Sequence, residues 1–171
     1  MTFKSIEEAL ALFGLDLLPV DEIPELSHMF LASGCEVLEM AALAFPEPSE
    51  HPEDLRMQLR QALALAGRTI PDRLSAARHL RQLYALRSAS GKLAPFETAR
   101  AILDIFRLVE DELPEERLVG ESFGISAIVG LYYSYGDFPS DDIESTREVD
   151  RDLLTALIQL VTSASPLQPR G

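Results

Sequence analysis

The sequence predicts an all-α protein: a single-domain bundle of about six to seven antiparallel helices joined by short Gly/Pro loops. Three observations support this fold class. Helix caps and stops recur along the chain, the strict apolar/polar alternation of strands is almost absent, and short Gly/Pro segments separate the helical stretches. The predicted domain covers residues 1–162, with a proline-rich internal linker at 45–52 and a flexible C-terminal tail at 163–171.

Capping signals place the first helices. Ser5-Ile6-Glu7-Glu8 is a capping box, and we expect Gly14 to close the helix that it opens. A second helix is expected from residue 21 or 22 to residue 33, where Gly34 stops or bends it. Residues 35–45 are almost wholly apolar after Glu39 and are expected to continue as helix.

Two similar passages precede the next helices. The segments 67–71 and 91–95 each begin with glycine and end with proline. Glycine suits the end of one helix and proline suits the first turn of the next. Helices are therefore expected up to about Ser88 and from Pro95 to about Glu112.

An uncharged stretch predicts the centre of the bundle. Residues 118–135 carry no charge after Glu121, so we expect one buried helix over this range. Gly120, Gly124 and Gly130 each lower helix propensity by about 1 kcal/mol. This cost favours close packing of a neighbouring helix against the glycines, and the alternative is a ligand lying on the bare backbone.

The last helix is expected from near Ser140 or Ser145 to about Thr162. If the helix starts early, Asp150 projects onto its apolar face. We therefore prefer Asp150 as the cap of a later-starting helix. The alternative is a buried acid that needs an arginine partner.

The net charge of −13 is unevenly distributed. Between Glu53 and Arg107 ten bases face five acids, whereas the rest of the chain has five bases and 23 acids. The acidic arms either neutralise the basic middle or face a basic partner. The arginines between residues 73 and 87 scatter around their helix, so nucleic-acid binding is not expected.

The sequence contains little catalytic chemistry. The single cysteine, Cys35, has no basic neighbour in sequence to activate it. The three histidines lack metal-ligand spacing, and Glu25-x-x-His28 lacks the second such motif of di-metal bundles. We expect no catalytic residue, no cofactor and no metal. Without a signal peptide or a membrane-spanning stretch, the expected location is cytoplasmic.

One constellation predicts a protein interface. Three of the four tyrosines lie in Tyr132-Tyr133-Ser134-Tyr135, and a phenylalanine and several acids follow at once. At helical spacing Tyr132 and Tyr135 share a side, while Tyr133 points elsewhere. Tyrosines ringed by acids are typical of a hot spot for a basic partner. The alternative is a core helix end with hydroxyls reaching water. The predicted contact residues are Tyr132, Tyr133, Tyr135, Asp137, Phe138, Asp141, Asp142 and Glu144.

The segment 128–137, Ile-Val-Gly-Leu-Tyr-Tyr-Ser-Tyr-Gly-Asp, resembles the first helix and turn of a tetratricopeptide repeat, but no period of about 34 residues holds along the chain. The resemblance implies a stack of helical hairpins that binds peptides. A tyrosine pair near a run of acids is also similar in composition to the acidic helical immunity proteins that block basic nuclease toxins.

The sequence therefore predicts a non-enzymatic acidic helical protein that binds a basic protein partner, as an immunity, chaperone or adaptor protein does. One alternative is a ligand-binding or enzymatic bundle whose pocket lies against Gly124 and Gly130, with His28 or Asp150 as its polar group. Another alternative is a structural homodimer that buries its surplus apolar surface in an isologous interface.

Overall fold

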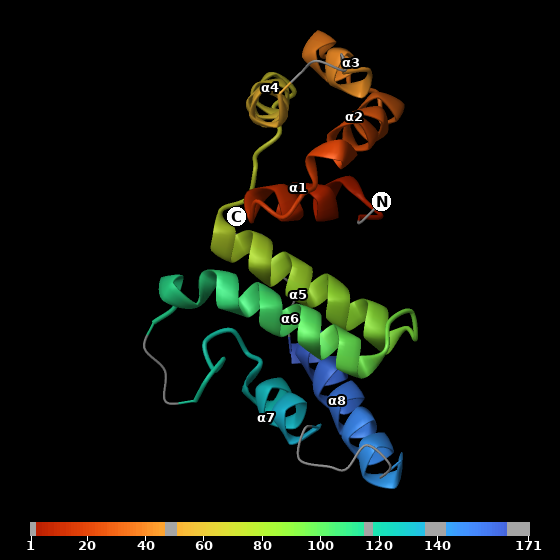
Figure 1. Ribbon diagram of the computed structural model, residues 1–171, viewed down its shortest axis with the longest axis vertical. Helices are drawn as coiled ribbons and strands as arrows, with labels where there is room; N and C mark the ends of the chain where they lie inside the picture. Colours follow the sequence, from red (N-terminus) through yellow and green to blue (C-terminus); the bar gives the residue numbers. More distant parts are fainter. Residues whose placement is uncertain (1–2, 47–50, 115–117, 136–142, 164–171) are drawn as a thin grey trace, which may run out of the picture. The chain divides into compact units, whose positions relative to one another are not determined.

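The computed structural model describes residues 3–46, 51–114, 118–135 and 143–163. Within these ranges the chain forms eight α-helices and two 3-10 helices, with no strand (Figure 1). The all-α prediction is confirmed, and the expected six to seven helices is close to the number found. The chain divides into two compact units, Met1–Ala76 and Ala77–Gly171. The single domain predicted for residues 1–162 stays a prediction, and residues 164–171 of the predicted tail lie outside the described ranges.

The first unit contains four α-helices and one short 3-10 helix. They are α1 (Ile6–Gly14), η1 (Val20–Glu22), α2 (Ile23–Ala32), α3 (Leu38–Ala44) and α4 (Pro52–Leu65). Helix α3 packs against both α2 and α4. The prediction that residues 35–45 are helical is wrong for 35–37, which form the connection into α3. The largest fully buried side chains are Phe3, Phe13, Leu18, Ile23, Leu26, Phe30, Met40, Leu43, Leu59 and Leu63.

Left-handed residues follow α1, α2 and α4 of the first unit. After α2, Gly34 has a φ of +90°, its N–H donates to the Leu31 carbonyl, and the Cys35 N–H donates to the Phe30 carbonyl. These two bonds define a Schellman turn. Gly67 forms the same turn after α4.

Helix α1 opens as the capping box predicts, because the Ser5 side chain accepts from the Glu8 N–H. Its end differs from the prediction. Gly14 is still helical, and Asp16, with a φ of +59°, occupies the left-handed position of the turn. Asp16 also lies near α4, with its carboxylate 3.7 Å from Arg60 and 4.0 Å from Arg56.

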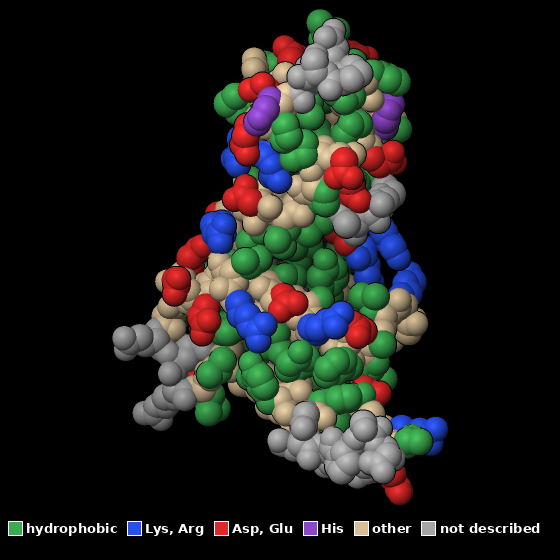
Figure 2. Space-filling model, viewed as in Figure 1, with side chains coloured by type: hydrophobic (Ala, Val, Ile, Leu, Met, Phe, Trp, Pro, Cys, Tyr) green, Lys and Arg blue, Asp and Glu red, His purple; other side chains and the backbone are tan. Residues whose placement is uncertain are grey.

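The second unit contains the remaining helices, although the first residues of α5 belong to the first unit. The helices are α5 (Arg73–Ala89), α6 (Pro95–Val109), η2 (Glu110–Glu112), α7 (Ser126–Ser134) and α8 (Ile143–Ser163). Helices α6, α7 and α8 pack against one another. Figure 2 shows a row of alternating acidic and basic side chains over α6. It includes the ion pairs of Arg100 with Glu97 and of Arg107 with Asp104.

The prediction of one helix over residues 118–135 is wrong in its first half. Residues 118–124 form a bend and turns, and α7 begins only at Ser126. The cause lies in Gly120 and Gly124, whose φ angles of +78° and +71° belong to the left-handed region rather than to an α-helix. A Cβ on Gly120 would also lie 2.6 Å from the Ile125 side chain. Composition alone does not separate a glycine inside a helix from a glycine in such a turn.

Arg81 of α5 holds these turns in place. Its guanidinium lies over the Phe123 ring, 4.9 Å from the centroid, and its Nη1 donates to the Phe123 carbonyl oxygen. Phe123 is fully buried, with its ring 5.8 Å from that of Phe106. Burial lowers the pKa of Arg81, and the charge of Arg78 contributes in the same direction. The half-buried Arg81 side chain therefore connects α5 to these turns.

Candidate protein interface at helix α7

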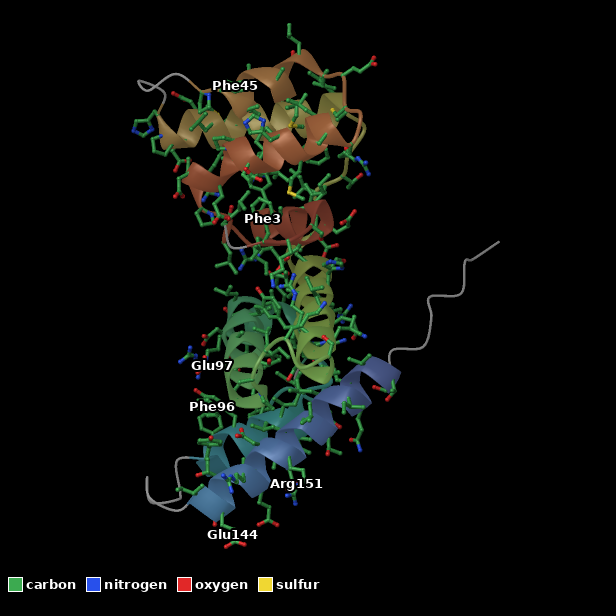
Figure 3. All side chains as sticks on the ribbon, turned by 90° about the vertical axis from the view of Figure 1, so that its right-hand side faces the viewer. Phe3, Phe45, Phe96, Glu97, Glu144 and Arg151 are labelled. Atoms are coloured by element: carbon green, nitrogen blue, oxygen red, sulfur yellow. The ribbon has the colours of Figure 1, made fainter. Side chains whose placement is uncertain are left out.

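Tyr132 and Tyr135 lie on the packed side of α7. The Tyr132 ring stacks on Phe96 of α6 at a centroid distance of 5.1 Å, and the Tyr135 ring lies tilted on the same Phe96 at 4.2 Å. Figure 3 shows Phe96 at the start of α6. Both tyrosines are half-buried. They share one side of the helix, as their spacing predicts, and they use it to join α7 to α6.

Tyr133 points to solvent. It is 58% exposed, its ring lies edge-on to Tyr132, and its hydroxyl accepts a hydrogen bond from Nη2 of Arg107 at 3.3 Å. The other terminal nitrogen of Arg107 is bonded to Asp104. The hydrogen bond with Tyr133 is the main cause that raises the pKa of Arg107. Tyr133 is thus an exposed aromatic ring whose hydroxyl is hydrogen-bonded to Arg107 of α6.

The remaining exposed positions of α7 carry small side chains. Ala127 and Gly130 precede Tyr133 at steps of three residues, so the three lie close together along one side of the helix. A Cβ on Gly130 would meet nothing within 4 Å. The close helix packing predicted at Gly130 is therefore wrong, because this glycine faces open space.

A shallow groove of about 510 Å³ runs between α7 and α8 at this place. Its lining residues are Ala127, Gly130, Leu131, Asp152, Thr155, Ala156 and Gln159. We use the name α7 face for these residues together with Tyr133. It combines an aromatic ring, three small residues (Ala127, Gly130 and Ala156) and the acidic side chain of Asp152.

Asp150 differs from its predicted role. Helix α8 begins at Ile143, so Asp150 lies inside the helix and does not cap it. No donor among the described residues bonds to its buried Oδ1. Burial raises the pKa of the Asp150 carboxyl. Burial also raises the pKa of Tyr135, and the charge of Asp150 adds to this effect.

The other predicted contact residues divide into two groups. Glu144 is exposed at the start of α8, where Figure 3 labels it. Asp137, Phe138, Asp141 and Asp142 lie outside the described residues. Sequence reasoning missed Arg107 and the α8 side of the groove. The repeat of small residues at positions 127 and 130 was the available signal for the groove.

The alternative, a pocket against Gly124 and Gly130 with His28 or Asp150 as its polar group, stays a prediction. The position of a Cβ on Gly124 lies 3.4 Å from Nη1 of Arg81, so this space is occupied. His28 belongs to α2 in the first unit, where its ring packs edge-on against Phe45 at 4.9 Å. Among the described residues, no group of three or more His, Cys, Asp or Glu side chains could hold a metal ion. Nor does any helix in the described ranges have the length and apolar character needed to cross a membrane.

Comparison of the chain with protein-family models, with curated proteins and with solved structures finds no match.

Proposed function

We propose that this protein binds a basic protein partner through the α7 face and acts as an interaction protein rather than as an enzyme. One observation carries the proposal. Tyr133 is an exposed aromatic ring beside a groove whose lining includes the small residues Ala127, Gly130 and Ala156. Tyrosine is enriched among the residues that contribute most to protein–protein binding. The small residues beside it let a partner approach the backbone of α7 closely.

Charge favours a basic partner. From Glu110 to Asp152 the sequence contains thirteen acids and three bases. Asp152 lines the groove, and Glu144 and Glu148 are exposed on the same helix. A segment with this excess of acids attracts a basic partner and accelerates its association, most strongly at low ionic strength.

The Arg107 hydrogen bond favours binding because it orders Tyr133 in advance. An exposed tyrosine loses rotamer freedom when it binds, at a cost of roughly 0.5–1.5 kcal/mol. Since the bond from Arg107 to the hydroxyl already restricts the ring, part of this cost is met in the free protein.

The test begins with affinity capture of a partner by the full chain, followed by calorimetry with the purified partner. We expect a basic partner whose affinity falls with added salt. Tyr133→Ala should weaken the binding about 30-fold, which corresponds to about 2 kcal/mol for a hot-spot residue.

Tyr84→Ala is the matched control, because Tyr84 lies on α5 outside the α7 face. It should leave the affinity unchanged. Equal binding by the Tyr133→Ala protein, or an acidic partner, would contradict the proposal. Sedimentation of the free protein adds a second check: a dimer that dissociates on Tyr133→Ala substitution would replace the basic partner with a second copy of this chain.

A further inference from the structure

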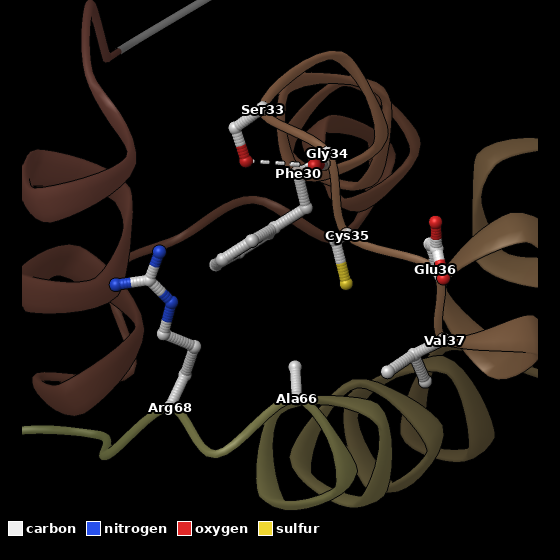
Figure 4. Close-up of a pocket in the computed structure, with 8 residues that line it drawn as sticks. All are labelled: Phe30, Ser33, Gly34, Cys35, Glu36, Val37, Ala66 and Arg68. Carbon is white, nitrogen blue, oxygen red and sulfur yellow. Dashed lines mark hydrogen bonds between the residues drawn. The ribbon is translucent and has the colours of Figure 1, made fainter.

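A second hollow lies in the first unit, where the ends of two helices meet. It occupies about 310 Å³ and is bordered by the turn after α2, the connection to α3 and the turn after α4. Its lining residues are Phe30, Ser33, Gly34, Cys35, Glu36, Val37, Ala66 and Arg68 (Figure 4). None of them belongs to the α7 face, so the hollow is independent of the proposed interface.

The walls of the hollow combine polar residues with a few apolar side chains. Phe30 is buried, and Val37 and Ala66 are half-buried. Figure 4 shows the Cys35 thiol and the Ala66 methyl group pointing into the same hollow from opposite sides. The guanidinium of Arg68 lies 5.8 Å from the centre of the Phe30 ring.

Backbone hydrogen bonds fix the two turns that border the hollow. The Phe30 carbonyl accepts from the N–H groups of Ser33 and Cys35 and from the Ser33 hydroxyl. The carbonyl of Leu63 accepts from the Arg68 N–H in the turn after α4. These bonds hold in place the backbone from which Cys35 and Arg68 extend.

Arg68 is the cation among these side chains. No ion pair joins it to a carboxylate within the described residues, and Glu36, the acid of the lining, is exposed and not paired with it. A guanidinium binds a carboxylate through two parallel hydrogen bonds.

We propose that this hollow binds a small monocarboxylic acid with an aromatic or branched apolar body. The carboxylate pairs with Arg68, and the apolar body lies against the half-buried Val37 and Ala66, beside the Cys35 thiol. A water molecule occupies about 30 Å³ in the liquid, so the hollow holds a ligand of about ten non-hydrogen atoms. Phenylacetate has this size and charge and is a suitable probe.

The single cysteine of the chain makes the test specific. Iodoacetamide alkylates Cys35 in the full-length protein, and mass spectrometry follows the rate. Phenylacetate should slow alkylation about fivefold at about four times its dissociation constant, because labelling follows the unbound fraction. Phenylacetamide, which has the same shape without the charge, should not protect the thiol.

Arg68→Met should abolish the protection, and Arg60→Met is its matched control. Arg60 also lies over a phenylalanine ring in the first unit, 5.1 Å from the centre of Phe13, but it does not line the hollow. Protection should persist in the Arg60→Met protein. Glu36→Gln should strengthen protection, because it removes a negative charge from the lining.

Three results would overturn the proposal: no protection by phenylacetate, equal protection by phenylacetamide, or unchanged protection in the Arg68→Met protein. A shift of amide NMR signals for the lining residues provides a readout independent of the thiol. Ala66→Leu, which places a larger side chain in the hollow, should abolish those shifts.

Discussion

Two regions of the molecule contain the same three parts: a glycine in a left-handed turn, a buried phenylalanine and an arginine over its ring. They are Gly34, Phe30 and Arg68 in the first unit, and Gly124, Phe123 and Arg81 in the second. In the second unit the arginine is half-buried and donates to the phenylalanine carbonyl. In the first unit the arginine is exposed, and the space beside it is a hollow of about 310 Å³.

Both arginines contact a phenylalanine ring, so the ring contact does not distinguish them. Whether the guanidinium is buried and hydrogen-bonded to a carbonyl decides whether the arginine stabilises the fold or stays available to a ligand. If a guanidinium that donates to a buried carbonyl moves away, the carbonyl oxygen is left buried without a hydrogen-bond donor, which is unfavourable. A guanidinium that only lies over a ring loses little when it turns to a ligand, because an exposed cation–π contact contributes roughly 0.5–1 kcal/mol.

The largest expected effect tests this contrast directly. Arg81→Met should lower the free energy of unfolding by about 2–3 kcal/mol, because the buried Phe123 carbonyl loses its donor. Arg68→Met should change it by less than about 0.5 kcal/mol, as a surface substitution does. Urea denaturation followed by circular dichroism measures both. Similar losses of unfolding free energy in the two variants would contradict the distinction between the half-buried, hydrogen-bonded Arg81 and the exposed Arg68.

The two turns provide a second comparison. Gly34→Ala should cost about 1 kcal/mol, since a side chain in the left-handed region is strained but meets no neighbour within 4 Å. Gly124→Ala should cost slightly more, up to about 2 kcal/mol, because its Cβ would also contact Nη1 of Arg81 at 3.4 Å, and this guanidinium is bonded to the Phe123 carbonyl. If thermal melting shows the reverse order, the turn of the first unit is the more tightly packed one.

Gly130 shows what a glycine does where neither strain nor a neighbour requires it. It lies inside α7 and faces open space. Gly130→Ala should therefore stabilise the protein by roughly 0.5–1 kcal/mol, because alanine loses less backbone entropy in a helix. A loss of stability would show that a side chain at position 130 meets a neighbour across the groove between α7 and α8.

The smallest effect concerns Asp150, whose buried Oδ1 accepts no hydrogen bond from the described residues. Burial raises the pKa of this carboxyl in the folded state above that of an ordinary aspartate. The folded state therefore binds the proton more tightly than the unfolded state does, so stability falls as pH rises from the unfolded to the folded pKa. Asp150→Asn should flatten this slope and slightly stabilise the protein at neutral pH. A steeper slope in the variant would contradict this assignment.

Most helices could be predicted from the sequence because their ends have local causes. The glycines at 67 and 91 form the turns that their position before a proline suggests, and Ser5 caps α1 as its spacing to Glu8 requires. The spacing of the tyrosines also separated Tyr133 from Tyr132. These features depend on residues within one or two turns of each other.

The segment 118–125 and the hollow at Arg68 could not be predicted in the same way. The turns at Gly120 and Gly124 depend on Arg81, which lies about forty residues earlier and donates to Phe123. The hollow depends on the meeting of Phe30 with Arg68 across a similar distance. Neither apolar periodicity nor a capping signal reports a contact between residues so far apart in sequence.

The residue at position 16 affects both the end of α1 and its contact with α4. Glycine would fill the left-handed position after α1 with less strain, and the helix would still end there. An aspartate at this position has two effects: it ends the helix, and its carboxylate lies within ion-pair distance of Arg56 and Arg60 on α4. Replacement by glycine would keep the left-handed turn but remove the carboxylate contacts to α4. A substitution that the backbone conformation favours would therefore weaken the link between α1 and α4.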